Sequence, residues 1–99
     1  MDLEAFTASL AGNAPTHGAS PLLRALWHQG RGDWEAAHRI AQDQPDPAGA
    51  WVHAHLHRAE GDADNAGYWY RRAEQPFPAV SLEEEWEAIA AALLSESTK

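Results

Sequence analysis

The sequence has no cysteine, and this absence removes several kinds of chemistry at once. Without thiols, the chain cannot form a disulfide framework, a thiolate metal site or a cysteine nucleophile. Basic residues are also few, because seven Lys and Arg stand against fifteen Asp and Glu and give a formal net charge of −8 at pH 7. A field of that sign repels nucleic-acid phosphates and anionic lipid surfaces. We therefore expect neither nucleic acid nor a membrane as a partner.

Long hydrophobic runs and β-branched stretches are missing as well. No segment approaches the roughly 20 apolar residues that span a bilayer, and residues 1–4 are acidic where a secretory leader carries positive charge. A cytoplasmic location is the resulting expectation. Between residues 1 and 88 the valines and isoleucines are Ile40, Val52 and Val80, and no stretch alternates apolar and polar residues. Strands are therefore not expected.

Sequence motifs for catalysis are also missing. Serine and histidine are both present, but there is no Gly-x-Ser-x-Gly nucleophile turn, no glycine-rich phosphate loop and no paired-carboxylate signature. We therefore assign no catalytic residue, and the sequence does not favour an enzyme.

What the sequence does contain is a clear set of helix boundaries. Five positions have the residue types that begin helices, namely Ser20, Asp33, Asp46, Asp62 and Ser81. Pro47 follows Asp46 at a first helical position, and Glu84 forms a capping box with Ser81. The acidic run Glu83–Glu85 then fits the positive end of the last helix dipole. Glycines and prolines end the other segments, which predicts helices over about 3–11, 20–30, 33–44, 46–60, 62–75 and 81–95.

An internal repeat links the middle of the chain. The segment Gly32–Ala37 aligns with Gly61–Ala66 at an offset of 29 residues, and in both copies Gly-Asp joins two predicted helices with an alanine four places after the Asp. This pattern resembles the turn and second helix of a tetratricopeptide-like repeat, in which the small residue allows close helix packing. In the second copy, Tyr70, Ala73 and Pro76 continue the likeness.

The resemblance covers about residues 20–76 and implies a fold. We expect an all-α domain over residues 1–99, because 99 residues with 44% hydrophobic content suffice for one core. It would consist of two repeat-like antiparallel hairpins, at about 20–44 and 46–76, with one helix added at each end. The C-terminal helix is expected at about 81–95.

A second resemblance lies within the second hairpin. The run Trp51–Asp62, continuing through Asn65-Ala66 and Tyr68–Tyr70, is similar to a family of short microbial proteins to which no activity is assigned. This likeness implies no function, but it points to the turn at Gly61 as the place to look.

Histidines on the fourth predicted helix are the first candidates for chemistry. His53 and His57 are four residues apart and so share one helix face, and Glu60 follows three residues later. His38, on the preceding helix, can approach them if the hairpins stack tightly. These four side chains are candidate ligands for a divalent transition metal such as zinc, nickel or copper, while the sequence as a whole predicts no cofactor. The alternative is that the imidazoles form hydrogen bonds at helix contacts or face water.

Polar residues are also dense around Gly61, which suggests a shallow ligand pocket. Arg58 would offer a bidentate donor to a carboxylate, while His57 and Glu60 exchange protons with a small ligand. The ligand-binding residues predicted in this way are His57, Arg58, Glu60, Asn65 and Tyr68. The structural alternative assigns Asp62 to a helix cap and pairs Arg58 with surface acids.

Five tryptophans are many for a chain of this length. Most should be core, but a domain this small struggles to bury all five. We therefore expect one or two to lie half-exposed beside Tyr68 and to form a contact surface.

Two hypotheses of function follow. The first is a helical-repeat module for protein interaction or self-association, with a protein partner or a homodimer, because two hairpins are short for a solenoid. The second is a small-ligand or metal-binding protein that uses the histidine and carboxylate face, with weak hydrolytic or isomerising chemistry. Convergence of His38, His53, His57 and Glu60 in one place would favour the second.

Overall fold

The structure is a computed structural model that describes residues 2–15 and 17–97. Its helices are α1 (Leu3–Ala8), the 3-10 helix η1 (Ser9–Ala11), α2 (Pro21–Gly30), α3 (Trp34–Ala41), α4 (Ala48–Ala59), α5 (Ala63–Arg72) and α6 (Leu82–Ser97). The described residues contain no strand, so the expected all-α class is confirmed. The last helix runs two residues beyond its expected end at residue 95.

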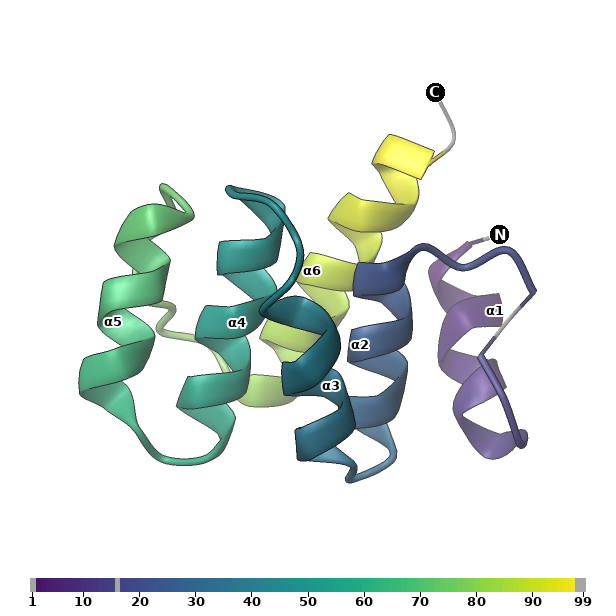
Figure 1. Ribbon diagram of the computed structural model, residues 1–99. Coiled ribbons are helices and arrows are strands. Elements are labelled where there is room, and N and C mark those ends of the chain that lie inside the picture. The colour runs from purple at the N-terminus through teal and green to yellow at the C-terminus, as the bar shows by residue number, and fades with distance from the viewer. Residues whose placement is uncertain (1, 16, 98–99) are drawn as a thin grey trace.

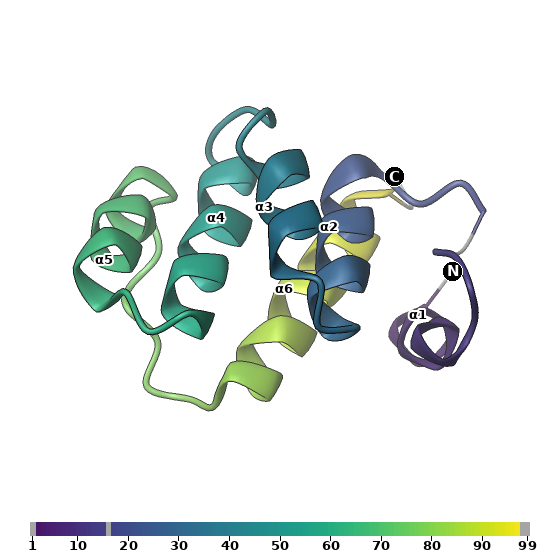
Figure 2. The ribbon, with the colours of Figure 1, turned by 60° about the horizontal axis from the view of Figure 1, so that its bottom comes forward.

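The helices form two hairpins with a further helix across them. Figures 1 and 2 show α2 and α3 as one antiparallel hairpin and α4 and α5 as a second hairpin beside it. The long C-terminal helix α6 crosses both hairpins and contacts α2 and α4. At one end of the molecule, α1 packs against α6. The arrangement agrees with the hairpin packing expected from the sequence.

The two hairpin turns have the same backbone geometry. Gly32 and Gly61 both have positive φ, at 86° and 90°, which is the left-handed conformation that glycine adopts without strain. The following amides close the turns, because Asp33 N–H donates to the His28 carbonyl at 2.8 Å and Asp62 N–H to the His57 carbonyl at 2.9 Å. The 29-residue sequence repeat is therefore also a repeat of backbone structure.

Side-chain caps begin most of the helices as the sequence predicts. Ser20, Asp33 and Asp62 each accept the backbone amide three residues ahead, and Ser81 accepts that of Glu84 while its hydroxyl donates to the Glu84 carboxylate. These bonds satisfy amides that have no partner within the helix.

The expected cap at Asp46 is wrong. Helix α4 starts at Ala48 with Pro47 in the cap position, and no side chain caps it. The Asp46 carboxylate instead accepts two hydrogen bonds from the Arg72 guanidinium, at 2.7 and 3.0 Å. The charged side chain of Arg72 on α5 therefore binds the carboxylate that the local sequence predicted as the cap of α4.

Most of the hydrophobic core lies between α6 and the helices it crosses. Its most buried large side chains are at most 1% exposed and are Phe6, Leu23, Leu26, Leu56 and Ile89. A smaller cluster of Ala54, Ala66 and Tyr70 joins α4 to α5. Ala37 and Ala66, the small residues of the repeat, are both fully buried.

Tryptophan burial is graded, but three tryptophans rather than the expected one or two are partly exposed, and of these Trp69 is the one whose ring contacts Tyr68, with centroids 5.1 Å apart. Trp27 and Trp86 are buried, whereas Trp34, Trp51 and Trp69 are partly exposed. The indole N–H of Trp27 donates to the Ser9 carbonyl at 3.0 Å, and that of Trp86 donates to the Leu26 carbonyl at 2.9 Å. Each buried indole thus keeps a hydrogen-bond partner.

None of the described helices combines the length and apolar character needed to cross a bilayer.

Candidate metal centre

Three histidines from two adjacent helices converge at one place. His38 comes from α3, while His53 and His57 lie one turn apart on α4, which is next to α3 in Figure 1. The Nε2 atoms of His38 and His53 are 2.9 Å apart. Each of the three imidazoles offers a ring nitrogen, and these nitrogens all lie within 4.8 Å of one another. We call His38, His53 and His57 the histidine cluster.

Two tryptophan rings hold the imidazoles in position. Trp34 stacks on His38 with ring centroids 4.7 Å apart, and Trp69 from α5 stacks on His53 at 4.0 Å. The Trp34 ring is itself fixed, because its N–H donates to the Leu56 carbonyl at 2.6 Å. Each tryptophan restricts rotation of the imidazole on which it stacks, so the ring nitrogens of His38 and His53 keep their mutual orientation.

The third imidazole is oriented by a carboxylate. His57 Nδ1 lies 2.7 Å from Glu60 Oε2, and His57 Nε2 lies 3.5 Å from the side-chain nitrogen of Asn65. Because a carboxylate only accepts hydrogen bonds, the Nδ1 atom carries the proton and the Nε2 atom keeps its lone pair. A carboxylate behind a histidine is the usual outer partner of metal-binding histidines. Glu60 therefore lies behind His57, and its carboxylate groups with His57 and Asp62 rather than with His38 and His53, so three of the four predicted metal ligands converge.

Electrostatics favour the neutral forms of His53 and His38. Burial lowers the pKa of His53 to about 4, with further lowering by His38, His57 and Arg72 and a small opposing effect of Asp46. Burial and the neighbouring His57 also lower the pKa of His38, against the attraction of Glu60. Neutral imidazoles have lone pairs, which metal coordination requires.

The cluster lies just below the surface. His53 and His57 are each 7% exposed, and His38 is partly exposed. Two imidazole nitrogens that share one tetrahedral zinc ion, at about 2.0–2.1 Å from it, lie roughly 3.3 Å apart. The distance of 2.9 Å between His38 and His53 needs only a small adjustment to reach that value. This pair can thus hold a metal after a small side-chain movement, and His57 offers a third nitrogen within 4.8 Å.

The five residues predicted around Gly61 do not form one pocket. His57, Glu60 and Asn65 lie together, as described above. Arg58 points elsewhere, where it bonds Glu85 at 3.0 Å and also the Val80 carbonyl. Tyr68 is 46% exposed, and its hydroxyl accepts a hydrogen bond from Arg72 at 3.3 Å. Arg58 and Tyr68 are therefore separated from the other three because each has a partner on a different part of the surface.

A buried carboxylate is the feature that the sequence interpretation missed. Glu85 on α6 is 4% exposed and accepts hydrogen bonds from His55 Nδ1 at 2.7 Å, from Arg58 at 3.0 Å and from the Tyr70 hydroxyl. We call these four residues the Glu85 network. Gln29 Oε1 lies 3.2 Å from His55 Nε2, so both nitrogens of this imidazole have an oxygen neighbour. The run Glu83–Glu85 lies in the first turn of α6, as expected, but the dipole interpretation does not predict the buried hydrogen-bond partners of Glu85.

Hydrogen bonds decide the charge state of this network. Burial would raise the pKa of Glu85, but hydrogen bonds from His55, Tyr70 and Arg58 outweigh burial and lower that pKa overall. Burial and the adjacent Glu85 carboxylate raise the pKa of Tyr70. The network thus contains an ionised carboxylate and a neutral phenol. Position 85 lies one turn before the buried Ile89 and therefore on the same face of α6. This spacing is the sequence signal that distinguishes Glu85 from Glu83 and Glu84.

Comparison with known proteins leaves the chain without an assigned family. No protein-family model, curated protein or solved structure matches it. The tetratricopeptide-like resemblance and the likeness to short microbial proteins therefore stay predictions.

Proposed function

We propose that this protein binds a divalent transition metal through His38, His53 and His57. The observation that carries the proposal is the convergence of three imidazole nitrogens, all within 4.8 Å of one another, from two adjacent helices. Three histidines are a ligand set that suits zinc, and they leave one tetrahedral position for a fourth donor. The cytoplasmic location expected from the sequence remains part of this proposal.

The donor atoms indicate which ions the site would prefer. Imidazole nitrogen suits zinc, copper and nickel, whereas magnesium and calcium prefer oxygen ligands. Copper(II) generally binds nitrogen sites more tightly than zinc or nickel, so the identity of the ion inside a cell depends on which metals are available. Glu60 supports the site in either of two roles, as an oxygen ligand or as the partner that orients His57.

Calorimetric titration of the metal-free protein with Zn²⁺ tests the proposal. We expect one ion per chain. We also expect His38→Ala, His53→Ala and His57→Ala each to weaken binding at least tenfold, because loss of a group that only supports a ligand already weakens binding by about tenfold and loss of a ligand should weaken it more. His17→Ala is the matched control, because His17 is exposed and lies outside the histidine cluster. Binding of equal affinity in all four variants would end the proposal.

Self-association is a second candidate function, which an exposed apolar segment supports. Phe77, Val80 and Leu82 are 49%, 45% and 38% exposed and lie close together in the chain between α5 and the start of α6. Exposed large apolar side chains in such a group are typical of contact surfaces. The proposed partner is a second copy of this chain, which corresponds to the interaction module expected from the tetratricopeptide-like resemblance.

Sedimentation of the wild-type chain across a range of concentrations tests this second candidate. We expect a dimer that Phe77→Ser or Val80→Ser converts to a monomer, with little loss of helicity because both side chains are already half exposed. Tyr68→Ser, at the exposed aromatic of α5, serves as the comparison outside this segment. A monomer at the highest concentrations reached would contradict the candidate.

A further inference from the structure

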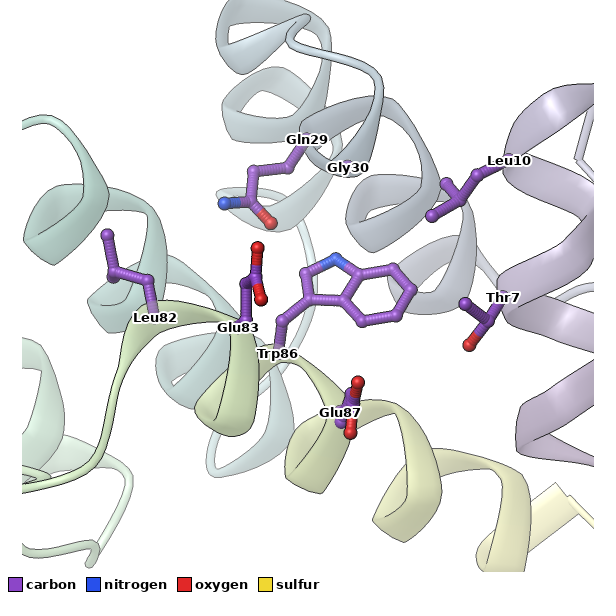
Figure 3. A pocket seen from close by; sticks show the side chains of 8 residues that line it. All are labelled: Thr7, Leu10, Gln29, Gly30, Leu82, Glu83, Trp86 and Glu87. Atoms are coloured by element: carbon purple, nitrogen blue, oxygen red, sulfur yellow. The ribbon is translucent and has the colours of Figure 1, made fainter.

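A pocket shares no residue with the histidine cluster, and it shares only Leu82 with the apolar segment proposed for self-association. It has a volume of about 300 Å³ and lies where the first turns of α6 meet α1, η1 and the C-terminal end of α2 (Figure 3). Its lining residues are Thr7, Leu10, Gln29, Gly30, Leu82, Glu83, Trp86 and Glu87. We call it the Trp86 pocket. Its volume is at the lower end of the range for small-molecule sites, so it suits a ligand of a few atoms around one ring.

The Trp86 ring provides the apolar part of the pocket. In Figure 3 the indole lies in the middle of the lining residues, with Leu10 and Thr7 on the side of its six-membered ring. The indole N–H is already used, because it donates to the Leu26 carbonyl at 2.9 Å. Phe6 stacks on the indole from the core with centroids 5.5 Å apart and fixes its plane. The indole is 8% exposed, so it offers a ligand only the part of its ring that lines the pocket and no hydrogen-bond donor.

Glycine at position 30 lets the wall of the pocket approach the ring closely. A Cβ atom there would stand 2.9 Å from Leu10 Cδ2 and 3.4 Å from Trp86 Cζ2. The first distance is shorter than carbon atoms tolerate, so a larger residue would push Leu10 away. The backbone of α2 thus forms one side of the pocket directly.

The charges around the pocket are all of one sign. Its charged lining residues are Glu83 and Glu87, which are exposed and one turn apart on α6. Within the described part of the chain, no hydrogen bond or ion pair engages either carboxylate. The C-terminal end of α2 adds a partial negative charge, and the chain as a whole carries −8.

The nearest cation in the sequence does not neutralise this charge. Arg31 directly follows Gly30, but its guanidinium donates to the carbonyls of Leu10 and Gly12 and lies 5.0 Å from the centre of the Trp27 ring. It is held by the end of η1 and by another tryptophan, and it is not among the residues that line the pocket. The two carboxylates thus remain available to a ligand.

We propose that the Trp86 pocket binds a small organic cation, an ammonium group attached to an aromatic or aliphatic body. The body packs against Trp86 and Leu10, where it leaves water, and the ammonium group lies between Glu83 and Glu87. The negative field of the chain raises the local concentration of such ligands. Anions are repelled for the same reason. The inference does not rest on the metal proposal, because the two sites share no residue.

Three probes of nearly equal shape test the charge requirement. They are 2-phenylethylamine, which is protonated at pH 7, the neutral 2-phenylethanol and the anionic phenylacetate. Binding is followed through the indole N–H signal of Trp86 in ¹H–¹⁵N spectra, with a chelator present so that metal has no effect. We expect the amine to shift this signal with an affinity roughly tenfold higher than that of the alcohol, because it gains two exposed ion pairs. Equal binding of amine and alcohol, or no shift with the amine, would overturn the proposal.

Matched variants separate the pocket from the general charge of the chain. The double variant Glu83→Gln/Glu87→Gln should lose most of the preference for the amine over the alcohol. The control is Glu35→Gln/Glu96→Gln, which removes the same charge at exposed positions outside the pocket and should keep the preference. Thr7→Phe fills the exposed rim and should block both ligands. Equal loss in the two double variants would show a non-specific field effect and refute the site.

Discussion

His38 and His53 face each other across two helices, with their Nε2 atoms 2.9 Å apart. Two neutral imidazoles at this distance share one hydrogen, so one Nε2 atom donates and the other accepts. A metal between them needs a lone pair on both atoms, and the shared hydrogen must then move to the Nδ1 atom of the donor ring. Metal binding at the cluster would therefore replace an existing hydrogen bond rather than organise an empty space.

Metal should stabilise the folded protein, because the unfolded chain does not bring the three histidines together. Zn²⁺ at roughly 100 times its dissociation constant adds about 2.7 kcal/mol to the free energy of unfolding. For a domain of this size the melting temperature should rise by about 10 °C or more. Thermal unfolding followed by circular dichroism measures the shift. The rise should persist in His17→Ala and fall to about half or less in His53→Ala at the same Zn²⁺ concentration.

Substitution of Glu60 distinguishes its two roles. If the carboxylate only orients His57 through the 2.7 Å hydrogen bond, Glu60→Gln should lower zinc affinity by about tenfold, because an amide still reaches Nδ1 as an acceptor. If Glu60 is itself a ligand, the loss should approach that of His57→Ala. Calorimetric titrations of the two variants, run side by side with wild type, give the ratio.

Removal of the buried carboxylate should be far more costly than removal of its exposed neighbour. Glu85→Ala leaves His55, Arg58 and Tyr70 without their shared acceptor, and we expect a loss of about 3–4 kcal/mol in the free energy of unfolding. Glu83→Ala, on the solvent side of the same turn, should change it by less than about 0.5 kcal/mol. Urea unfolding of both variants provides the comparison. Similar midpoints would contradict the network described for Glu85.

The Glu85 network also predicts how stability depends on pH. The folded-state pKa of Glu85 lies below its ordinary value of 4.5, so its contribution is complete above that pH and is lost as the pH falls through the folded-state pKa. The raised pKa of Tyr70 acts at the other end, because the unfolded phenol ionises near 10 and stability falls above that pH. Urea midpoints from pH 2 to 11 measure both limbs. Glu85→Gln should flatten the acid limb, and Tyr70→Phe the alkaline limb.

The sequence predicted those features that depend on nearby residues. Ser20, Asp33 and Asp62 cap the helices assigned to them, because each cap is decided within three residues of the cap itself. The spacing of His53 and His57 likewise placed them on one helix face. Asp46 failed as a cap because Arg72, 26 residues away, competes for the same carboxylate. Local patterns contain no information on such a partner.

The histidine cluster and the Glu85 network also depend on contacts between helices that the local sequence does not specify. The approach of His38 to the histidine cluster was predicted only conditionally, since it depends on how tightly α3 packs on α4. The network of Glu85 was missed because its neighbours Glu83 and Glu84 are exposed, while its own partners come from α4 and α5. Nothing in the spacing of those partners along the chain brings them to one carboxylate. Tertiary packing therefore determines both sites, whereas the helices that support them follow from sequence.

The repeated turns allow a last prediction with a control of opposite sign. A Cβ atom at Gly32 or Gly61 would meet nothing within 4 Å, so the cost of alanine there is the left-handed backbone alone, about 1 kcal/mol. Gly67 lies inside α5 with ordinary helical geometry, where alanine should add up to about 1 kcal/mol. Because the two turns are distant, the effects of Gly32→Ala and Gly61→Ala should add in the double variant. Urea unfolding measures all four variants, and equal effects at positions 61 and 67 would show that the turn geometry does not carry the cost.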